Sequence, residues 1–204
     1  MTLQVTAGLG KNAQFLGYTM TAASFKNDLV FNYPTSQAGD LIIAYVVSEN
    51  LSVPTVNDGW TTLYSNTTPA VNGTGSGRLL MYKRRGYESS ANVYVSGGGN
   101  ATCIALRGYL GTIENIAEFV ANNTIGSTSF TQSINSQQSL ITLVNQDGGV
   151  NNASITIANT TNSYHSEPGY FRSMAVGYNL GSASDPITVT TSSDAVYGVR
   201  LTVF

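Results

Sequence analysis

The fold is decided by a stretch that the chain carries twice, from Arg78 to Tyr109 and again, 94 residues later, from Arg172 to Val203. The first copy reads RLLMYKRRGYESSANVYVSGGGNATCIALRGY, and the second reads RSMAVGYNLGSASDPITVTTSSDAVYGVRLTV. Each copy has an apolar strand pattern, a turn, a short strand, small polar residues and a last apolar strand. The match lies in the pattern more than in identical residues. It therefore indicates one supersecondary unit used twice and predicts two related halves.

Strand patterns recur along the rest of the chain between turns rich in Gly, Asn and Ser. The continuous apolar run from Leu41 to Ser48 predicts a central strand that is covered on both faces. Ile113 to Val120 fits a short helical turn or a strand, and we favour the strand. The segment from Gly111 to Gln138 links the two copies and is compatible with a long cross-over strand. These patterns predict an all-β fold, an antiparallel β-sandwich of jelly-roll type made of two related halves.

Length and composition indicate one domain with an unusually uncharged surface. A chain of 204 residues suits a single β-sandwich, so we expect one domain over residues 1–204, with residues 1–12 as a possible docking arm. Charged residues make up 10% of the chain, against about 25% in typical domains. Such surfaces suit proteins that pack beside copies of themselves or beside other subunits, since charge normally keeps free monomers soluble.

Charge and cysteine content argue against several classes of protein. The net charge is -2 and the longest basic run is Lys83-Arg84-Arg85, so we expect no nucleic acid partner and interpret this run as a solvated edge or a subunit contact. The single cysteine, Cys103, is interpreted as a small core residue, and it allows no internal disulfide. No signal-peptide pattern follows Met1, and the run from Leu41 to Val47 is too short to cross a bilayer. We therefore expect synthesis in a host cytoplasm and no membrane partner.

The residues that could carry chemistry form no reaction centre. His165 is the single histidine and lies in a pattern that predicts a turn-rich loop, with no group nearby to orient it as a base. Zinc sites need clustered cysteine and histidine, which the chain lacks. All six aspartates, Asp28 and Asp40 among them, fall in predicted turns, where they cap the backbone. We expect no catalytic, cofactor-binding or metal-binding residues, no cofactor and no enzymatic activity.

Aromatic residues point instead to contacts with a partner. Tyrosine offers an apolar body and a polar tip, which suits interfaces. We name Trp60, Tyr164, His165 and Tyr170 as possible interface or glycan contacts. For Trp60 we favour a core plug beneath the loops over a ligand platform.

Several short motifs, taken together, resemble those of a known group of β-sandwich proteins. The motifs are Gly39-Asp40-Leu41-Ile42-Ile43-Ala44, Gly59-Trp60-Thr61-Thr62-Leu63, Arg78-Leu79-Leu80-Met81-Tyr82-Lys83-Arg84, Tyr94-Val95-Ser96 and Ala105-Leu106-Arg107-Gly108. They are similar to a module of tailed-bacteriophage virion proteins, of head decoration, cement or fibre type, in which a Gly-Asp-Leu strand, a Gly-Trp-Thr turn and a Tyr-x-Arg strand recur. The second half lacks the Gly-Trp-Thr turn, and Tyr164 to Tyr170 occupies its place. The resemblance implies a virion location and brings no functional residue with it.

The expected function is therefore that of a structural protein of a bacteriophage virion, a capsid decoration or cement protein that binds the head surface. Its expected partners are the phage major capsid protein or other virion subunits, and its own copies in a homo-oligomer such as a trimer. A tail-fibre or receptor-binding module that recognises a host surface glycan is the alternative. A polysaccharide depolymerase would need a carboxylate pair that the sequence does not place.

Overall fold

The computed structural model describes residues 14–24, 27–57, 59–67, 76–109, 112–121, 126–130, 139–146, 154–158, 160, 162–166, 173–180, 187–191 and 196–203. All regular structure in these residues is β-strand, and every strand pairing is antiparallel. The all-β prediction is confirmed. The proposed docking arm, residues 1–12, lies outside the described residues, as does Tyr170.

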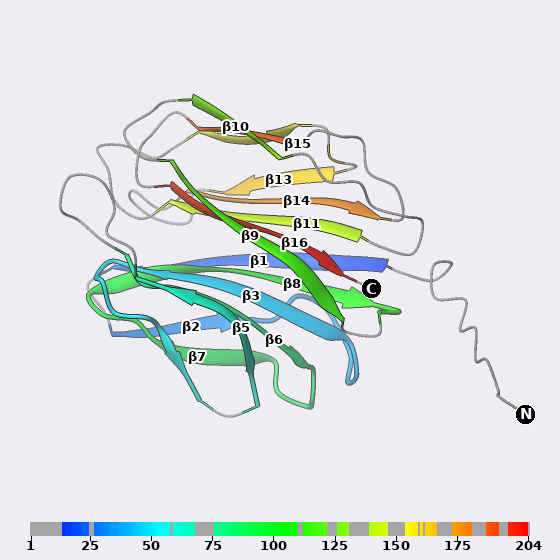
Figure 1. Ribbon diagram of the computed structural model, residues 1–204. Helices are drawn as coiled ribbons and strands as arrows, with labels where there is room; N and C mark the ends of the chain where they lie inside the picture. The colour runs from blue at the N-terminus through cyan, green and yellow to red at the C-terminus, as the bar shows by residue number, and fades with distance from the viewer. Residues whose placement is uncertain are drawn as a thin grey trace, which may run out of the picture.

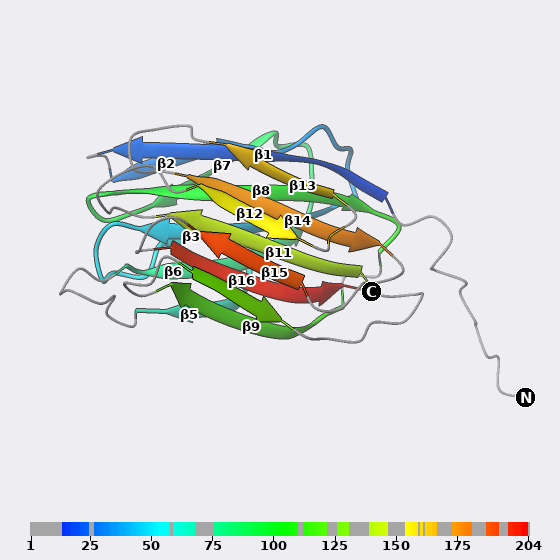
Figure 2. The same cartoon turned by 90° about the horizontal axis from the view of Figure 1, so that it is seen from above.

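Four sheets are stacked in layers (Figure 1). The first five-stranded sheet has the order β1-β8-β3-β6-β5, with β1 Gln14–Ser24, β8 Gly98–Arg107, β3 Leu41–Ser48, β6 Arg78–Arg84 and β5 Thr61–Asn66. The second has the order β13-β14-β11-β16-β9, with β13 Asn162–Ser166, β14 Met174–Leu180, β11 Ser139–Gln146, β16 Val196–Val203 and β9 Ile113–Ala121. These two sheets form the middle layers, and their strands run in similar directions, as Figure 2 shows.

A three-stranded sheet covers the outer face of each five-stranded sheet (Figure 1). The small sheet on the first has the order β2-β7-β4, with β2 Asp28–Asn32, β7 Ser90–Tyr94 and β4 Thr55–Val56. The small sheet on the second has the order β10-β15-β12, with β10 Gly126–Phe130, β15 Ile187–Thr191 and β12 Ile155–Ala158. Adding eight to each strand number of the sheets β1-β8-β3-β6-β5 and β2-β7-β4 gives the strand orders of the other two sheets.

The pleat explains why the central strand β3 is apolar along its whole length. Successive side chains of a strand point to opposite faces. Ile43 and Tyr45 therefore face the second five-stranded sheet, while Ile42 and Ala44 face the small sheet β2-β7-β4. All eight residues of β3 are buried, as the sequence predicts for a strand that is covered on both faces.

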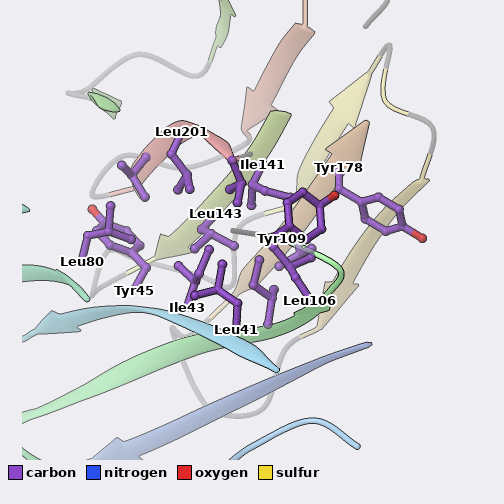
Figure 3. Close-up of a cluster of buried hydrophobic side chains, with 14 of the residues drawn as sticks. Leu41, Ile43, Tyr45, Leu80, Leu106, Tyr109, Ile141, Leu143, Tyr178 and Leu201 are labelled. Carbon is purple, nitrogen blue, oxygen red and sulfur yellow. The ribbon is translucent and has the colours of Figure 1, made fainter. Parts of the chain in front are cut away.

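The central core lies between the two five-stranded sheets and takes side chains from both (Figure 3). Leu41, Ile43 and Leu106 meet Ile141 and Leu201 across this layer. At one side, the ring of Phe15 in β1 stacks on that of Tyr178 in β14, with 3.9 Å between the ring centroids. Cys103 lies fully buried in the core beneath the small sheet, which confirms its interpretation as a core residue, and burial raises the pKa of its thiol.

Polar groups also join the two middle sheets. Arg78 of β6 is fully buried and is paired with Glu118 of β9 through its Nε, while its Nη2 lies 3.3 Å from Glu118 Oε2. Tyr64 and Asn66 of β5 donate to the same carboxylate, Asn66 over 2.9 Å. The guanidinium of Arg78 lies 4.8 Å from the centre of the Tyr197 ring. A charge with this many partners is held inside the sandwich without being left unpaired.

A second polar bridge lies on the middle strands. Asn145 of β11 donates from Nδ2 to the backbone oxygen of Tyr45 over 3.1 Å and accepts a 2.5 Å hydrogen bond from Thr102. Asn100 donates to the backbone oxygen of Gln146. Because these groups are buried, each hydrogen bond fixes the position of one sheet on the other.

Two of the sequence motifs meet at one turn. Arg107 donates from Nε and Nη2 to the two oxygens of Asp40, over 2.9 and 2.8 Å. These hydrogen bonds from Arg107 are the main reason why the pKa of Asp40 is lowered. Asp40 also accepts from the backbone N–H of Gln37, as expected of a turn aspartate. Asp28, in contrast, begins strand β2, so its assignment to a turn is wrong.

The ungapped alignment of the two copies is wrong for their last strands. At an offset of 94, Ile104 of β8 is aligned with Gly198, but the side chains of β16 that enter the central core include Val199 and Leu201. A shift by one residue moves every side chain of a strand to the other face. Strand β8 begins at Gly98, within the small polar residues of the first copy. A Cβ there would lie 2.7 Å from the backbone oxygen of Ala23, so the glycine allows a close approach of strands.

Candidate functional site

A pocket of about 240 Å³ lies where the small sheet β2-β7-β4 meets β5 and β6. Its apolar wall comes from four residues that lie far apart in the sequence: Tyr33 after β2, Val56 at the end of β4, Trp60 before β5, and Ala91 in β7. The turn that ends at Gly59, whose φ is 86°, places Trp60 in this wall. We call this cavity the Trp60 pocket.

An aromatic cluster fixes the position of the Trp60 ring. Tyr33 meets this ring edge-on, with 5.9 Å between centroids and 74° between planes, and Phe31 lies 6.1 Å away. Phe31 is fully buried and Tyr33 nearly so, while Trp60 itself stays partly exposed. Trp60 thus packs against the core beneath the small sheet, as we favoured, and also forms part of a cavity wall. A partly exposed ring that its neighbours hold in place is pre-organised for contact with a ligand.

The polar wall of the Trp60 pocket carries an ion pair and three uncharged groups. Lys83 Nζ lies 2.6 Å from Glu88 Oε1 and 5.7 Å from the centre of the Trp60 ring. Asn57, Ser90 and Asn92 are the other polar residues that line the pocket. The charges of Lys83 and Glu88 cancel, so the wall offers hydrogen-bonding groups and no net charge.

Two pKa shifts define the protonation states in this wall. The pKa of Glu88 is lowered to about 2. The hydrogen bond from Lys83 is the largest cause, and backbone N–H groups such as that of Gly86 add to it. Burial raises the pKa of Tyr33 to about 12. At neutral pH Glu88 is therefore an anion and Tyr33 keeps its proton.

We expect the carboxyl of Glu88 to titrate with a midpoint near 2 in the folded protein, against an ordinary value of 4.5. Because the folded pKa lies below the unfolded one, the pair stabilises the fold above pH 4.5, and this contribution is lost as the pH falls from 4.5 towards 2. Carbon-13 NMR of the side-chain carboxyl measures the midpoint. Lys83→Met should move it back towards 4.5, and a wild-type midpoint already near 4.5 would show that the pair does not form.

The structure does not bring Trp60 together with Tyr164 and His165, and Tyr170 lies outside the described residues. Tyr164 and His165 lie in β13, an edge strand of the second five-stranded sheet, although we expected a loop there. Trp60 precedes β5, at the edge of the first sheet, and Figure 2 shows β5 and β13 on opposite sides of the sandwich. A single cleft that combines Trp60 with Tyr164 is therefore excluded.

The basic run also has a role that sequence reasoning missed. Lys83 pairs with Glu88, Arg84 donates to the backbone oxygens of Gly39 and Tyr109, and Arg85 donates to that of Ser36. These cations bind neighbouring turns of the same chain, and Arg84 does so while remaining exposed. The side chains of β7 alternate, with Ala91 and Val93 buried and Asn92 exposed, but no local pattern shows that this strand lies beside Trp60.

Other kinds of site receive no support from the described residues. Among them, no group of three or more His, Cys, Asp or Glu side chains is placed to hold a metal ion. The described part of the chain also contains no helix of the length and apolarity needed to span a membrane. Comparisons of the chain with protein-family models, with curated proteins and with solved structures find no match.

Proposed function

We propose that the chain is a structural protein of a bacteriophage virion that decorates or cements the head surface. Its action is adhesion: the protein buries area against the major capsid protein or sister copies and breaks no covalent bond. The proposal begins from the resemblance of the Gly-Asp-Leu, Gly-Trp-Thr and Tyr-x-Arg motifs to phage virion proteins. The way in which the chain uses its charged residues adds the supporting physical argument.

The observation that carries the proposal is the use of cations inside the molecule. The chain has nine Lys and Arg residues. In the part of the chain that the structure describes, the cations that bond to groups of the same chain include Arg78, Lys83, Arg84, Arg85 and Arg107. These charges hold sheets and turns together. Because charged residues make up only 10% of the chain, uncharged groups supply most of its polar surface, and they cost less to desolvate than ions when an interface forms.

The outer face of the small sheet β2-β7-β4 shows this character. Val30 is 55% exposed and Tyr94 is 49% exposed, on neighbouring strands of that sheet. Tyr87, in the turn between β6 and β7, is fully exposed. Tyrosine combines contact area with one hydrogen-bonding group and is enriched in protein interfaces.

The architecture of two related halves belongs to the same proposal. The repeated strand order supports a duplication, and the shared central core supports a single domain. A sandwich of two such halves leaves β1, β5, β9 and β13 as the edges of the five-stranded sheets in the described part of the chain. Edge strands need a cover, and a closed oligomer such as a trimer supplies one. Jelly-roll connectivity remains a prediction.

Mass spectrometry of purified particles tests the proposal. In virions of the phage that encodes this chain, we expect many copies, in a fixed ratio to the major capsid protein. Absence of the chain from the particles would contradict a virion role. A few copies per particle would contradict head decoration and would favour a tail component.

The Trp60 pocket favours a second candidate, a tail-fibre or receptor-binding module that recognises a host surface glycan. This candidate needs an accessible aromatic group beside uncharged hydrogen-bonding groups, and Trp60 with Ser90 and Asn92 supplies both. The two candidates differ in copy number and position on the particle.

A further inference from the structure

We propose that the Trp60 pocket binds one neutral pyranose ring of a surface glycan. The inference deepens the receptor-binding candidate and rests on it. Particle composition tests the decoration proposal, whereas sugar binding is measured on the purified chain, so the two can fail separately.

The size of the pocket limits the ligand to a single small ring. Its volume of about 240 Å³ corresponds to about eight waters at ~30 Å³ each. Pockets for drug-sized ligands begin at about 300 Å³. One sugar ring with its hydroxyl groups displaces a comparable amount of water, and the rest of a glycan chain would extend into solvent.

The chemistry of the walls matches the two kinds of surface on a sugar. A pyranose ring has a face of C–H groups, which packs against an aromatic ring such as Trp60. Its hydroxyl groups donate and accept hydrogen bonds at the rim of the ring. Asn57, Ser90 and Asn92 can pair with them, since an amide both donates and accepts.

Charge separates a neutral sugar from other small ligands. A quaternary ammonium group such as choline would need an aromatic face together with an anion. Here the Lys83 ammonium lies 5.7 Å from the centre of the Trp60 ring and 2.6 Å from Glu88, so it repels a second cation and already pairs the anion that such a ligand would need. An anion would meet a lysine whose charge is already neutralised. The ligand that fits is uncharged.

The expected affinity is low, and many copies would compensate for it. A ligand of one sugar ring in an open pocket is expected to bind with a Kd of about one millimolar. A particle that displays many copies gains avidity because later binding events become intramolecular. A weak site is therefore compatible with firm adhesion to a glycan-covered surface.

The chain provides its own reporter for the test. Trp60 is the sole tryptophan, so fluorescence excited where tyrosine does not absorb comes from the pocket alone. The purified protein is titrated with glucose, galactose, mannose, rhamnose and N-acetylglucosamine, and in parallel with choline and with inorganic phosphate. We expect at least one neutral sugar to give a saturable change with a Kd of about one millimolar.

Two matched variants locate the binding. Asn92→Ala removes a polar group from the pocket wall and should weaken sugar binding about fivefold to tenfold. Asn32→Ala changes an exposed asparagine of the same small sheet that does not line the pocket, and it should leave the Kd unchanged. Because Asn32 and Asn92 are both exposed, neither substitution should disturb the core. Thermal unfolding midpoints equal to that of the wild type would show that both variants fold.

Three results would overturn the inference. The first is that no neutral sugar gives a saturable change. The second is that choline or phosphate saturates the signal at lower concentration than every sugar. The third is that Asn92→Ala weakens binding no more than Asn32→Ala does.

Discussion

Glu118→Ala is expected to reduce the free energy of unfolding by about 3–5 kcal/mol, because it leaves the buried guanidinium of Arg78 without its anion. Tyr64 and Asn66 would lose their shared acceptor in the same change. Chemical denaturation of the purified protein measures the effect. Because Arg78 and Glu118 belong to different sheets, the loss reports on the contact between the two halves.

The matched control is Glu114→Ala, which removes an exposed glutamate from the same strand, β9, and should change stability by less than about 0.5 kcal/mol. The double variant Arg78→Met with Glu118→Leu should recover most of the loss, since an apolar pair can replace a buried ion pair. Equal effects of Glu118→Ala and Glu114→Ala would mean that the buried pair does not join the sheets.

Ile43→Ala and Ile141→Ala should each cost about 2–5 kcal/mol, the usual range for truncating a buried aliphatic side chain. Ile43 lies in the first five-stranded sheet and Ile141 in the second, and both enter the same central core. We therefore expect each variant to lower the midpoint of one cooperative transition, with fluorescence and circular dichroism giving the same curve.

Val30→Ala is the control for these two variants, because Val30 is 55% exposed on the small outer sheet, and it should be nearly neutral. A biphasic transition, in which Ile43→Ala shifts only one phase and Ile141→Ala only the other, would contradict a single domain. The halves would then unfold as separate units.

The sequence predicts the central strand β3 well. Its bounds agree with the predicted range, Leu41 to Ser48, because an apolar run that follows Gly39-Asp40 and ends at Ser leaves few alternatives. The strand at Ile113–Ala121 also agrees, where a helical turn was the other interpretation. Strand β4, of two residues, and the polar strand β13 were missed, because neither has an apolar pattern to detect.

The site could be predicted only in part. The sequence indicates the turn before Trp60, and it identifies Trp60 as a possible contact residue. The partners of Trp60 come from β2, β6 and β7, and no local pattern states that these strands meet there. The same holds for Arg78 and Glu118, which lie 40 residues apart and pair only because the two sheets face each other.

Imaging of intact particles tests the central claim, adhesion to the head of a virion, most directly. Particles of the encoding phage are labelled with an antibody against this chain and viewed by electron microscopy. The account predicts label over the whole surface of the head. Label confined to the tail would contradict head decoration, and particles without label, in a preparation whose denatured protein reacts with the antibody, would contradict a surface role on the virion.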